Sequence, residues 1–264
     1  MEAMKEDLVY TMDQLQSVGS DMLRCTAKIC EKEHIRYCMM FGSLIGAVRH
    51  HGPIPWDYDI DIAVAEADMP RFIEVMERDL PERFWVDFRS PLDSPKCLPR
   101  IGLRGYDTRN LHIDVYRMIG FPDAQEQWKK LVKRGRLLLE MRLVKAVDLR
   151  YYSGKKKKAI QRLRPLLFAM STESIVKRFD ALCTRYPYET ANKVGLNACR
   201  FDKYIYDKHI FEDTILVDYQ DFQVRIPREY DYVLGTMYRN YRQFPPQETI
   251  DKAMRGTHVV SALK

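Results

Sequence analysis

The chain has 264 residues, of which 46% are hydrophobic and 30% are charged, and this composition is typical of a globular protein. Such a length can bury a sizeable core without disulfides, and no apolar run is long enough to predict a membrane-spanning helix. Disorder, collagen-like repeats and a disulfide scaffold are therefore excluded. Lys and Arg number 43 against 37 Asp and Glu, so the formal net charge is +6.

This positive charge is concentrated in one segment. Between Lys129 and Arg164 there are 14 basic residues, opposed only by Glu140 and Asp148. Such a block predicts an anionic partner. The six cysteines are scattered without a CxxC or Cys/His cluster, which favours buried thiols in a reducing compartment over a zinc site. The polar, acidic N-terminus does not resemble a signal peptide, so a cytoplasmic location is expected.

The first 120 residues alternate between helical and strand patterns. Apolar residues spaced by three and four from Leu15 to Ile29 predict an amphipathic helix. A buried strand is expected at residues 37–41, followed at once by a helix at 43–49 with Ser43 as its N-cap. A further helix is predicted at residues 69–80, and strands are predicted at residues 59–64, 84–88, 100–104 and 111–119.

The second half of the chain begins as a helical, basic stretch at residues 124–185, with a break at 151–154. A hairpin-like pair of strands follows at 214–217 and 222–226, and a last helix at 230–241 is stopped by Pro245 and Pro246. We therefore expect an α/β (α+β) fold with three parts. These are a mixed-sheet core (1–123), a basic helical region (124–210) and a C-terminal hairpin and helix (211–264).

The most informative short sequence is Asp59-Ile60-Asp61-Ile62. On a strand, alternate residues point to the same face, so both carboxylates face one way while the isoleucines pack on the other. Two adjacent carboxylates repel each other unless a cation lies between them, and their hard oxygen ligands suit Mg²⁺ or Mn²⁺. The alternative is an exposed strand whose polar face is solvated.

Two neighbouring motifs favour the metal-binding interpretation. Gly42-Ser43 stands where a strand passes into a helix, and free backbone N–H groups at such a place favour a phosphate. Asp114 lies among strand-forming residues further along the chain. Together these features are typical of enzymes that hold metal-bound phosphates for transfer to a hydroxyl.

The motifs of residues 41–61 give a more specific prediction. Phe41-Gly-Ser-Leu-Ile-Gly-Ala-Val-Arg-His50 and Gly52-Pro-Ile-Pro-Trp-Asp-Tyr-Asp-Ile-Asp61 strongly resemble the signature of the LicD family of phosphocholine transferases, with which fukutin and the fukutin-related protein are grouped. The resemblance covers roughly residues 34–250 and is weak across the basic middle. It implies a nucleotidyltransferase-like fold that moves a phospho-alcohol from a CDP-activated donor to a glycan hydroxyl and releases CMP.

The resemblance also implies roles for individual residues. It makes Asp59, Asp61 and Asp114 catalytic residues and ligands of Mg²⁺ or Mn²⁺, with Asp114 as ligand, general base or both. Gly42 and Ser43 would hold phosphate oxygens. Four more residues of these motifs are candidates for substrate binding: Arg49, His50, Trp56 and Asp57. Tyr58 departs from the family pattern, because many relatives have a further Asp there.

The partners expected from this resemblance are a CDP-alcohol such as CDP-choline and a glycan acceptor, which is either a lipid-linked glycan or a precursor of the teichoic acid type. The basic segment predicts peripheral contact with an anionic membrane at its inner face. No aromatic–basic motif for nucleic acid is present, so no nucleic-acid partner is expected. Two alternatives stay open: a nucleotidyltransferase that adds NMP from an NTP to a small molecule or protein, and a non-enzymatic basic module that binds acidic polymers.

Overall fold

The centre of the protein is a mixed β-sheet. The computed structural model describes residues 6–87, 97–108, 110–146, 158, 161–162, 170–197, 204–255 and 257–263. Within this part of the chain the sheet has seven strands, in the order β2-β3-β6-β5-β4, with β7 beside β6 and β8 beside β7. These strands are β2 (Tyr37–Met39), β3 (Ile60–Ala65), β4 (Phe84–Val86), β5 (Arg100–Leu103), β6 (His112–Phe121), β7 (Lys193–Leu196) and β8 (Ile205–Asp207).

Strand β6 organises this sheet because it is long enough to pair with three others. It runs parallel to β3 along one edge. Along its other edge it pairs antiparallel with β5 through its first half and with β7 through its second half. The pairs β2–β3, β4–β5 and β7–β8 are also antiparallel. The mixed α/β fold predicted from the sequence is thereby confirmed.

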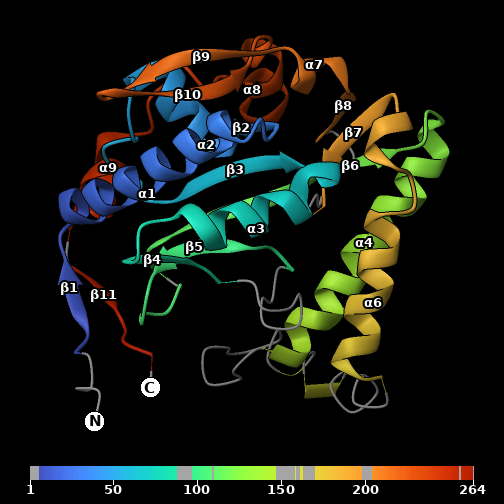
Figure 1. Ribbon diagram of the computed structural model, residues 1–264, viewed down its shortest axis with the longest axis horizontal. Helices are drawn as coiled ribbons and strands as arrows, with labels where there is room; N and C mark the ends of the chain where they lie inside the picture. The colour runs from blue at the N-terminus through green and yellow to red at the C-terminus, as the bar shows by residue number, and fades with distance from the viewer. Residues whose placement is uncertain are drawn as a thin grey trace.

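Helices α1 (Met12–Lys32) and α3 (Met69–Asp79) cover one face of the sheet (Figure 1). A capping box fixes the start of α1, since the Thr11 side chain accepts from the Gln14 N–H and the Gln14 side chain accepts in return. Leu15, Ile62 and Phe72 between these layers are completely buried. Apolar burial on this face stabilises the core and leaves polar side chains of the same strands for the other face.

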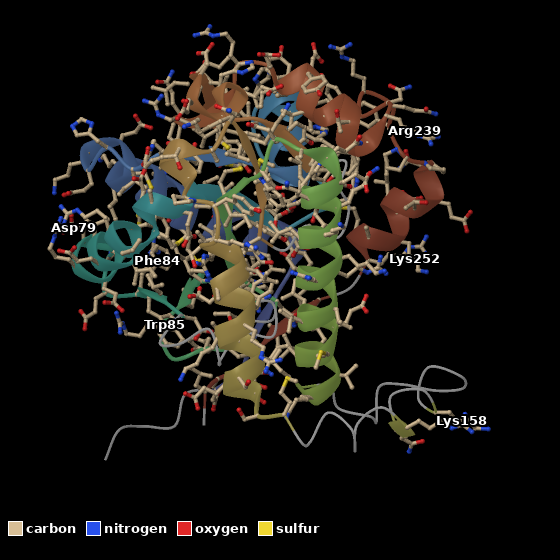
Figure 2. The ribbon with its side chains drawn as sticks, turned by 90° about the vertical axis from the view of Figure 1, so that its right-hand side faces the viewer. Asp79, Phe84, Trp85, Lys158, Arg239 and Lys252 are labelled. Atoms are coloured by element: carbon tan, nitrogen blue, oxygen red, sulfur yellow. The ribbon has the colours of Figure 1, made fainter. Side chains whose placement is uncertain are left out.

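A pair of helices, α4 (Gln125–Ala146) and α6 (Thr172–Cys183), lies side by side at one end of the molecule (Figures 1 and 2). Its apolar side chains pack against the end of β6 in a second core that includes Phe121, Leu131 and Phe179. Arg117 of β6 also bonds Asp180 of α6 at 2.7 Å. Residues 125–146 and 172–183 are helical, as predicted. The helical region expected at 124–210 is wrong in its last part, because β7 and β8 are strands of the central sheet. Residues 147–157, 159–160 and 163–169 lie outside the described part.

The C-terminal quarter packs back on the core (Figure 1). It comprises α7 (His209–Glu212), β9 (Thr214–Tyr219), β10 (Phe222–Pro227), α8 (Tyr230–Tyr238), α9 (Gln247–Met254) and β11 (His258–Val260). The hairpin of β9 and β10 lies against β2 and α1, where the Arg225 N–H donates to the Tyr37 hydroxyl at 3.3 Å. Strand β11 pairs with β1 (Leu8–Tyr10), so the two ends of the chain lie side by side.

The C-terminal elements differ from the prediction in two places. The helix predicted at 230–241 ends at Tyr238, because Arg239 adopts a φ of 57° that no helix continues. A further helix, α9, starts directly after Pro245-Pro246, because proline is tolerated in front of a helix and disfavoured inside one. In the described residues, no helix is both long and apolar enough to cross a bilayer.

Candidate functional site

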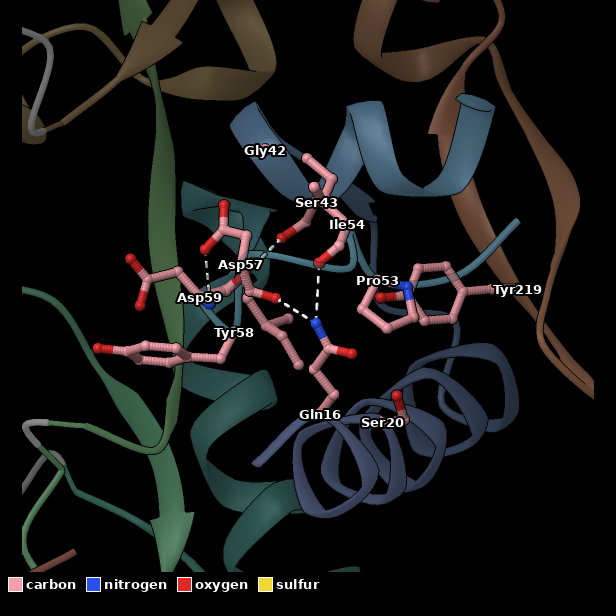
Figure 3. A pocket seen from close by; sticks show the side chains of 11 residues that line it. Gln16, Ser20, Gly42, Ser43, Pro53, Ile54, Asp57, Tyr58, Asp59 and Tyr219 are labelled. Atoms are coloured by element: carbon pink, nitrogen blue, oxygen red, sulfur yellow. Dashed lines mark hydrogen bonds between the residues drawn. The ribbon is translucent and has the colours of Figure 1, made fainter. Parts of the chain in front are cut away.

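The parallel pairing of β3 with β6 brings two of the predicted acidic residues together. Asp61 lies directly opposite Asp114 in this register. Residues opposite each other in a sheet share a face, so both side chains lie on the side away from Ile60 and Ile62. Both isoleucines are buried, as the sequence predicted. Asp59 lies two residues before Asp61 at the entry to β3, and Figure 3 shows its carboxylate turned toward the β6 ribbon.

Ser43 bonds the backbone at Asp59 and Asp61. Its Oγ accepts from the Asp61 N–H at 2.8 Å and donates to the Asp59 carbonyl at 3.3 Å. The helix in which it lies, α2 (Phe41–Ile45), begins at Phe41. Ser43 is therefore inside the helix, and the prediction that it is the N-cap is wrong. The chain continues as a π-helix from Gly46 to His50. The hydroxyl that was expected to hold phosphate is thus engaged in joining α2 to the start of β3.

A loop at residues 53–58 presents Asp57 to the same place. The side-chain amide of Gln16 in α1 donates to the carbonyls of Ile54 and Asp57, each at 2.8 Å (Figure 3). The Asp57 carboxylate accepts from the Asp59 N–H at 3.1 Å, and a Cβ at position 42 would lie 3.1 Å from it. Glycine at position 42 therefore gives this carboxylate room. Burial raises the pKa of Asp57 above its ordinary value.

These residues line a small pocket (Figure 3). Its enclosed space is only about 10 Å³, roughly the room that one water molecule needs. Four of the predicted site residues line it: Gly42, Ser43, Asp57 and Asp59. Gln16 and Tyr219, which were not predicted as site residues, line it as well.

Asp114 has two partners that were not predicted as site residues. Arg100 of β5 stands opposite it in register, and its Nε donates to Asp114 Oδ1 at 2.7 Å. His112 Nε2 lies 3.2 Å from the same oxygen. The side chain of Asp114 is only 4% exposed and that of Arg100 17%, so the guanidinium compensates a buried carboxylate. Only the pairing of β5 with β6 reveals this contact, because the two residues are 14 positions apart.

The oxygen ligands of Asp59, Asp61 and Asp114 have the chemistry that Mg²⁺ or Mn²⁺ prefers. Their arrangement does not form a finished metal site, however. In the described residues, no three His, Cys, Asp or Glu side chains gather closely enough to hold an ion. Asp114 is turned toward Arg100. The donor set thus fits a hard divalent cation in kind, whereas its present geometry serves the ion pair.

Arg49, His50 and Trp56 form a separate cluster with Phe244. The guanidinium of Arg49 lies 4.5 Å from the centre of the Phe244 ring and 5.9 Å from that of Trp56. Its Nη1 donates to the Tyr241 carbonyl at 2.7 Å, and its Nε donates to His50 Nε2 at 2.9 Å. In this conformation the cluster fastens the C-terminal segment to the loop that carries Asp57.

Part of the chain is similar to a known family of domains. Residues 34–134 match the family described as "LicD/FKTN/FKRP, nucleotidyltransferase domain". The match includes the α2 turn, the loop of Asp57 and all three predicted metal ligands. Residues 34–134 are therefore similar to a LicD-type nucleotidyltransferase domain, as the motifs indicated.

Curated relatives extend this similarity beyond the domain. The lipopolysaccharide cholinephosphotransferase LicD of Haemophilus influenzae is 24% identical over 252 residues, which is 90% of this chain and 94% of the relative. The human and mouse ribitol 5-phosphate transferases FKRP are 43% identical over 51 residues, covering 18% of this chain and 10% of theirs. An uncharacterised protein of Rickettsia typhi is 36% identical over 55 residues, or 21% of this chain and 18% of its own length.

Proposed function

We propose that the protein is a metal-dependent transferase that moves a phospho-alcohol from a CDP-activated donor to a hydroxyl of a glycan, with release of CMP. The observation that carries this proposal is the register that sets Asp61 beside Asp114, behind a Gly-Ser turn and inside the matched domain. The named transferases among the relatives, which move phosphocholine or ribitol phosphate, support it.

The acidic residues have distinct parts in this proposal. Asp59 and Asp61 would hold Mg²⁺ or Mn²⁺, and a bound ion of this kind neutralises charge on a transferring phosphoryl group. Asp114 would accept the proton of the glycan hydroxyl, and Arg100 keeps this carboxylate oriented in a site with little water. If Asp114 is instead a metal ligand, the ion would share this carboxylate with Arg100, which bonds its Oδ1.

The acceptor in this proposal is a glycan precursor, lipid-linked or of the teichoic acid type, at the cytoplasmic face of the membrane. The segment from Lys129 to Arg164 would hold the protein there through its positive charge. Most of its second half, including Lys155–Lys157, lies outside the described residues, so this contact stays a prediction from sequence.

The experiment that tests the function is a donor screen. The purified protein is incubated with Mg²⁺ and CDP-choline, CDP-ethanolamine, CDP-ribitol or CDP-glycerol, and nucleotide and glycan products are read by mass spectrometry. Metal-dependent CMP release and a mass gain equal to one phospho-alcohol on the acceptor are expected. Transfer of NMP from an NTP, with pyrophosphate released and no turnover of any CDP-alcohol, would replace this function with the nucleotidyltransferase alternative.

A further inference from the structure

A second cavity lies outside the acidic site. Its lining comes from four parts of the chain: the end of α1, the turn into β2, helix α7 and the hairpin of β9 and β10. Its volume is about 250 Å³. One water molecule needs only about 10–15 Å³ of such space. The cavity therefore has room for a small ligand.

This cavity is separate from the pocket of the acidic residues, and the two share no lining residue. Tyr37 begins β2 and lines the cavity, whereas Gly42 and Ser43 follow the other end of that strand and line the pocket. In the register of β2 with β3, Tyr37 pairs with Val64. Val64 is three residues beyond Asp61 and so lies about 10 Å farther along the strand. A ligand in the cavity would therefore leave the acidic site open.

The charged side chains that line the cavity already have charged partners. The Nε and Nη2 of Arg225 donate to the two oxygens of Glu31, each at 2.6 Å. The Nε and Nη2 of Arg36 donate to the two oxygens of Asp68, each at 2.7 Å. Glu212 lies 3.6 Å from the lysine four positions before it. An ionic ligand of either sign would have to compete with these pairs, so the cavity favours a neutral one.

Several neutral polar groups remain available to a ligand. The hydroxyls of Thr214 and Tyr37 both accept from Arg225, the first from Nη1 at 3.2 Å and the second from the backbone N–H at 3.3 Å. Among the described residues, neither hydroxyl donates its proton, and the His34 side chain makes no hydrogen bond. Burial raises the pKa of Tyr37, so its hydroxyl keeps the proton. Two O–H donors and an imidazole can thus bond a ligand.

The buried side chains of Ile35 and Phe211 add apolar walls to this polar cavity. We infer that the cavity is a second ligand site, and that it binds a neutral polyhydroxylated molecule, namely one sugar residue. Each hydroxyl of a sugar both donates and accepts, and its C–H groups can pack on apolar side chains. A neutral sugar also breaks none of the ion pairs. This inference goes beyond the proposed function, because the cavity lies apart from the acidic residues.

Sugar binding tests the inference without any turnover. Saturation-transfer NMR titrations are recorded on the full chain with glucose, galactose, mannose and N-acetylglucosamine. At least one of these sugars should bind, and its 6-phosphate should bind at least tenfold more weakly, because the guanidinium groups of the cavity are already paired. Binding of none of the four, or tighter binding of the phosphate, would overturn the inference.

Two variants locate the bound sugar. Thr214→Val removes a hydroxyl and keeps the shape of the side chain. His34→Gly removes the imidazole, and glycine adopts the φ of 54° at this position without strain. Each variant should weaken binding about fivefold, which is the size of one neutral hydrogen bond. Thr236→Val is the matched control, because the Thr236 hydroxyl bonds the Tyr232 carbonyl within α8, and it should bind as the wild type does. Unchanged affinity in both Thr214→Val and His34→Gly would refute the site.

Asp61→Asn separates this inference from the proposed function. The variant should lose CMP release but keep the sugar affinity of the wild type. Loss of sugar binding in Asp61→Asn, with binding kept in Thr214→Val, would place the sugar at the acidic residues and overturn the second site. If the wild type turns over no CDP-alcohol, the proposed function fails and the sugar titrations still decide the cavity.

A disaccharide of the sugar that binds best distinguishes the source of the ligand. Tighter binding than that of the monosaccharide supports a residue of a glycan chain, whereas equal or weaker binding supports a free sugar. Both results keep the ligand class, provided that Thr214→Val weakens the binding.

Discussion

Arg100 and Asp114 face each other across β5 and β6, and both side chains are mostly buried. The guanidinium also donates from Nη1 to the Thr108 carbonyl at 2.9 Å, and the Thr108 hydroxyl donates to Asp87 at 2.8 Å. A carboxylate in such a place is tolerated because its charge is compensated. Arg100 therefore takes the place of water as the partner of the Asp114 charge.

Replacing Arg100 by Gln should show how far the stability of the fold depends on this compensation. The Asp114 charge would be left without its guanidinium, and the free energy of unfolding should fall by about 3 kcal/mol. The double variant Arg100→Gln/Asp114→Asn should recover part of the loss. Urea unfolding of the single and double variants measures both effects. Lys177→Gln, which breaks an exposed pair with Glu173, should cost less than about 0.5 kcal/mol. An Arg100→Gln loss no larger than this control would contradict the account.

Ser43 and Ser20 offer a second comparison at this scale. Both are buried and line the same pocket, but Ser43 bonds the backbone of the acidic pair, whereas the Ser20 hydroxyl has no hydrogen-bond partner in the described part of the chain. Ser43→Ala should destabilise the fold by about 1–3 kcal/mol, because it leaves the Asp61 N–H unpaired, and it should lower kcat for CMP release at least tenfold. Ser20→Ala should match the wild type in denaturation and in turnover. Equal effects of the two variants would show that Ser43 does not position the site.

The elements could be predicted from sequence where local patterns decide them. The spacing of apolar residues by three and four predicted α1 and α3, and the alternation of apolar and polar residues predicted β3. In each case a buried face repeats along the segment. Which strands pair cannot be read locally, since register depends on contacts between distant residues. Asp61 and Asp114 were therefore expected at one site from motifs alone, whereas Arg100 was missed.

The ion pair of Arg36 with Asp68 should make the stability of the fold depend on pH. Arg36 precedes β2, and its Nε and Nη2 bond the two oxygens of Asp68, each at 2.7 Å. Burial alone would raise the pKa of Asp68, but the bonds with Arg36 outweigh it and lower the pKa. This carboxylate therefore adds stability above its unfolded pKa of about 4, and that stability is lost as the pH falls through the folded pKa.

Thermal unfolding between pH 6 and pH 2 tests this pair. The wild-type Tm should fall below about pH 4 more steeply than the Tm of Asp68→Asn, which lacks the titrating group. Glu74→Gln removes a largely exposed carboxylate that pairs with Arg71, and its curve should follow the wild type. Parallel curves for wild type and Asp68→Asn would mean that the Arg36 pair adds nothing.

At the scale of the whole molecule, the last strand joins the ends of the chain to the site. β11 pairs with β1, and His258 packs on Tyr58 with ring centroids 4.8 Å apart. The segment after it bonds the loop before β6, where the Asp107 N–H donates to the Ser261 carbonyl at 2.8 Å. Tyr58 precedes Asp59, so this strand braces both loops that lead to acidic residues. Tyr58 departs from the family pattern, and its contact with His258 depends on a residue 200 positions away that no local pattern predicts.

Removing residues 257–264 should therefore loosen the site without unfolding the core. Hydrogen exchange should rise in β1 and in residues 105–110, while β3 and β6 keep their protection, since the buried cluster of α1 and α3 is unchanged. His258→Ala, a smaller change, should raise exchange around Tyr58 alone. Unchanged exchange near residue 107 in the truncated protein would refute the bracing role.

The most direct test of the central claim is the turnover of Asp59→Asn and Asp61→Asn. With Mg²⁺ and the donor that the wild type uses best, each variant should release CMP at least about 10³-fold more slowly, because neutralising charge at the phosphate supplies several kcal/mol. Both should unfold at nearly the wild-type temperature, and EDTA should abolish wild-type activity until Mg²⁺ or Mn²⁺ is returned. Near-wild-type turnover by either variant, or activity in EDTA, would contradict the account.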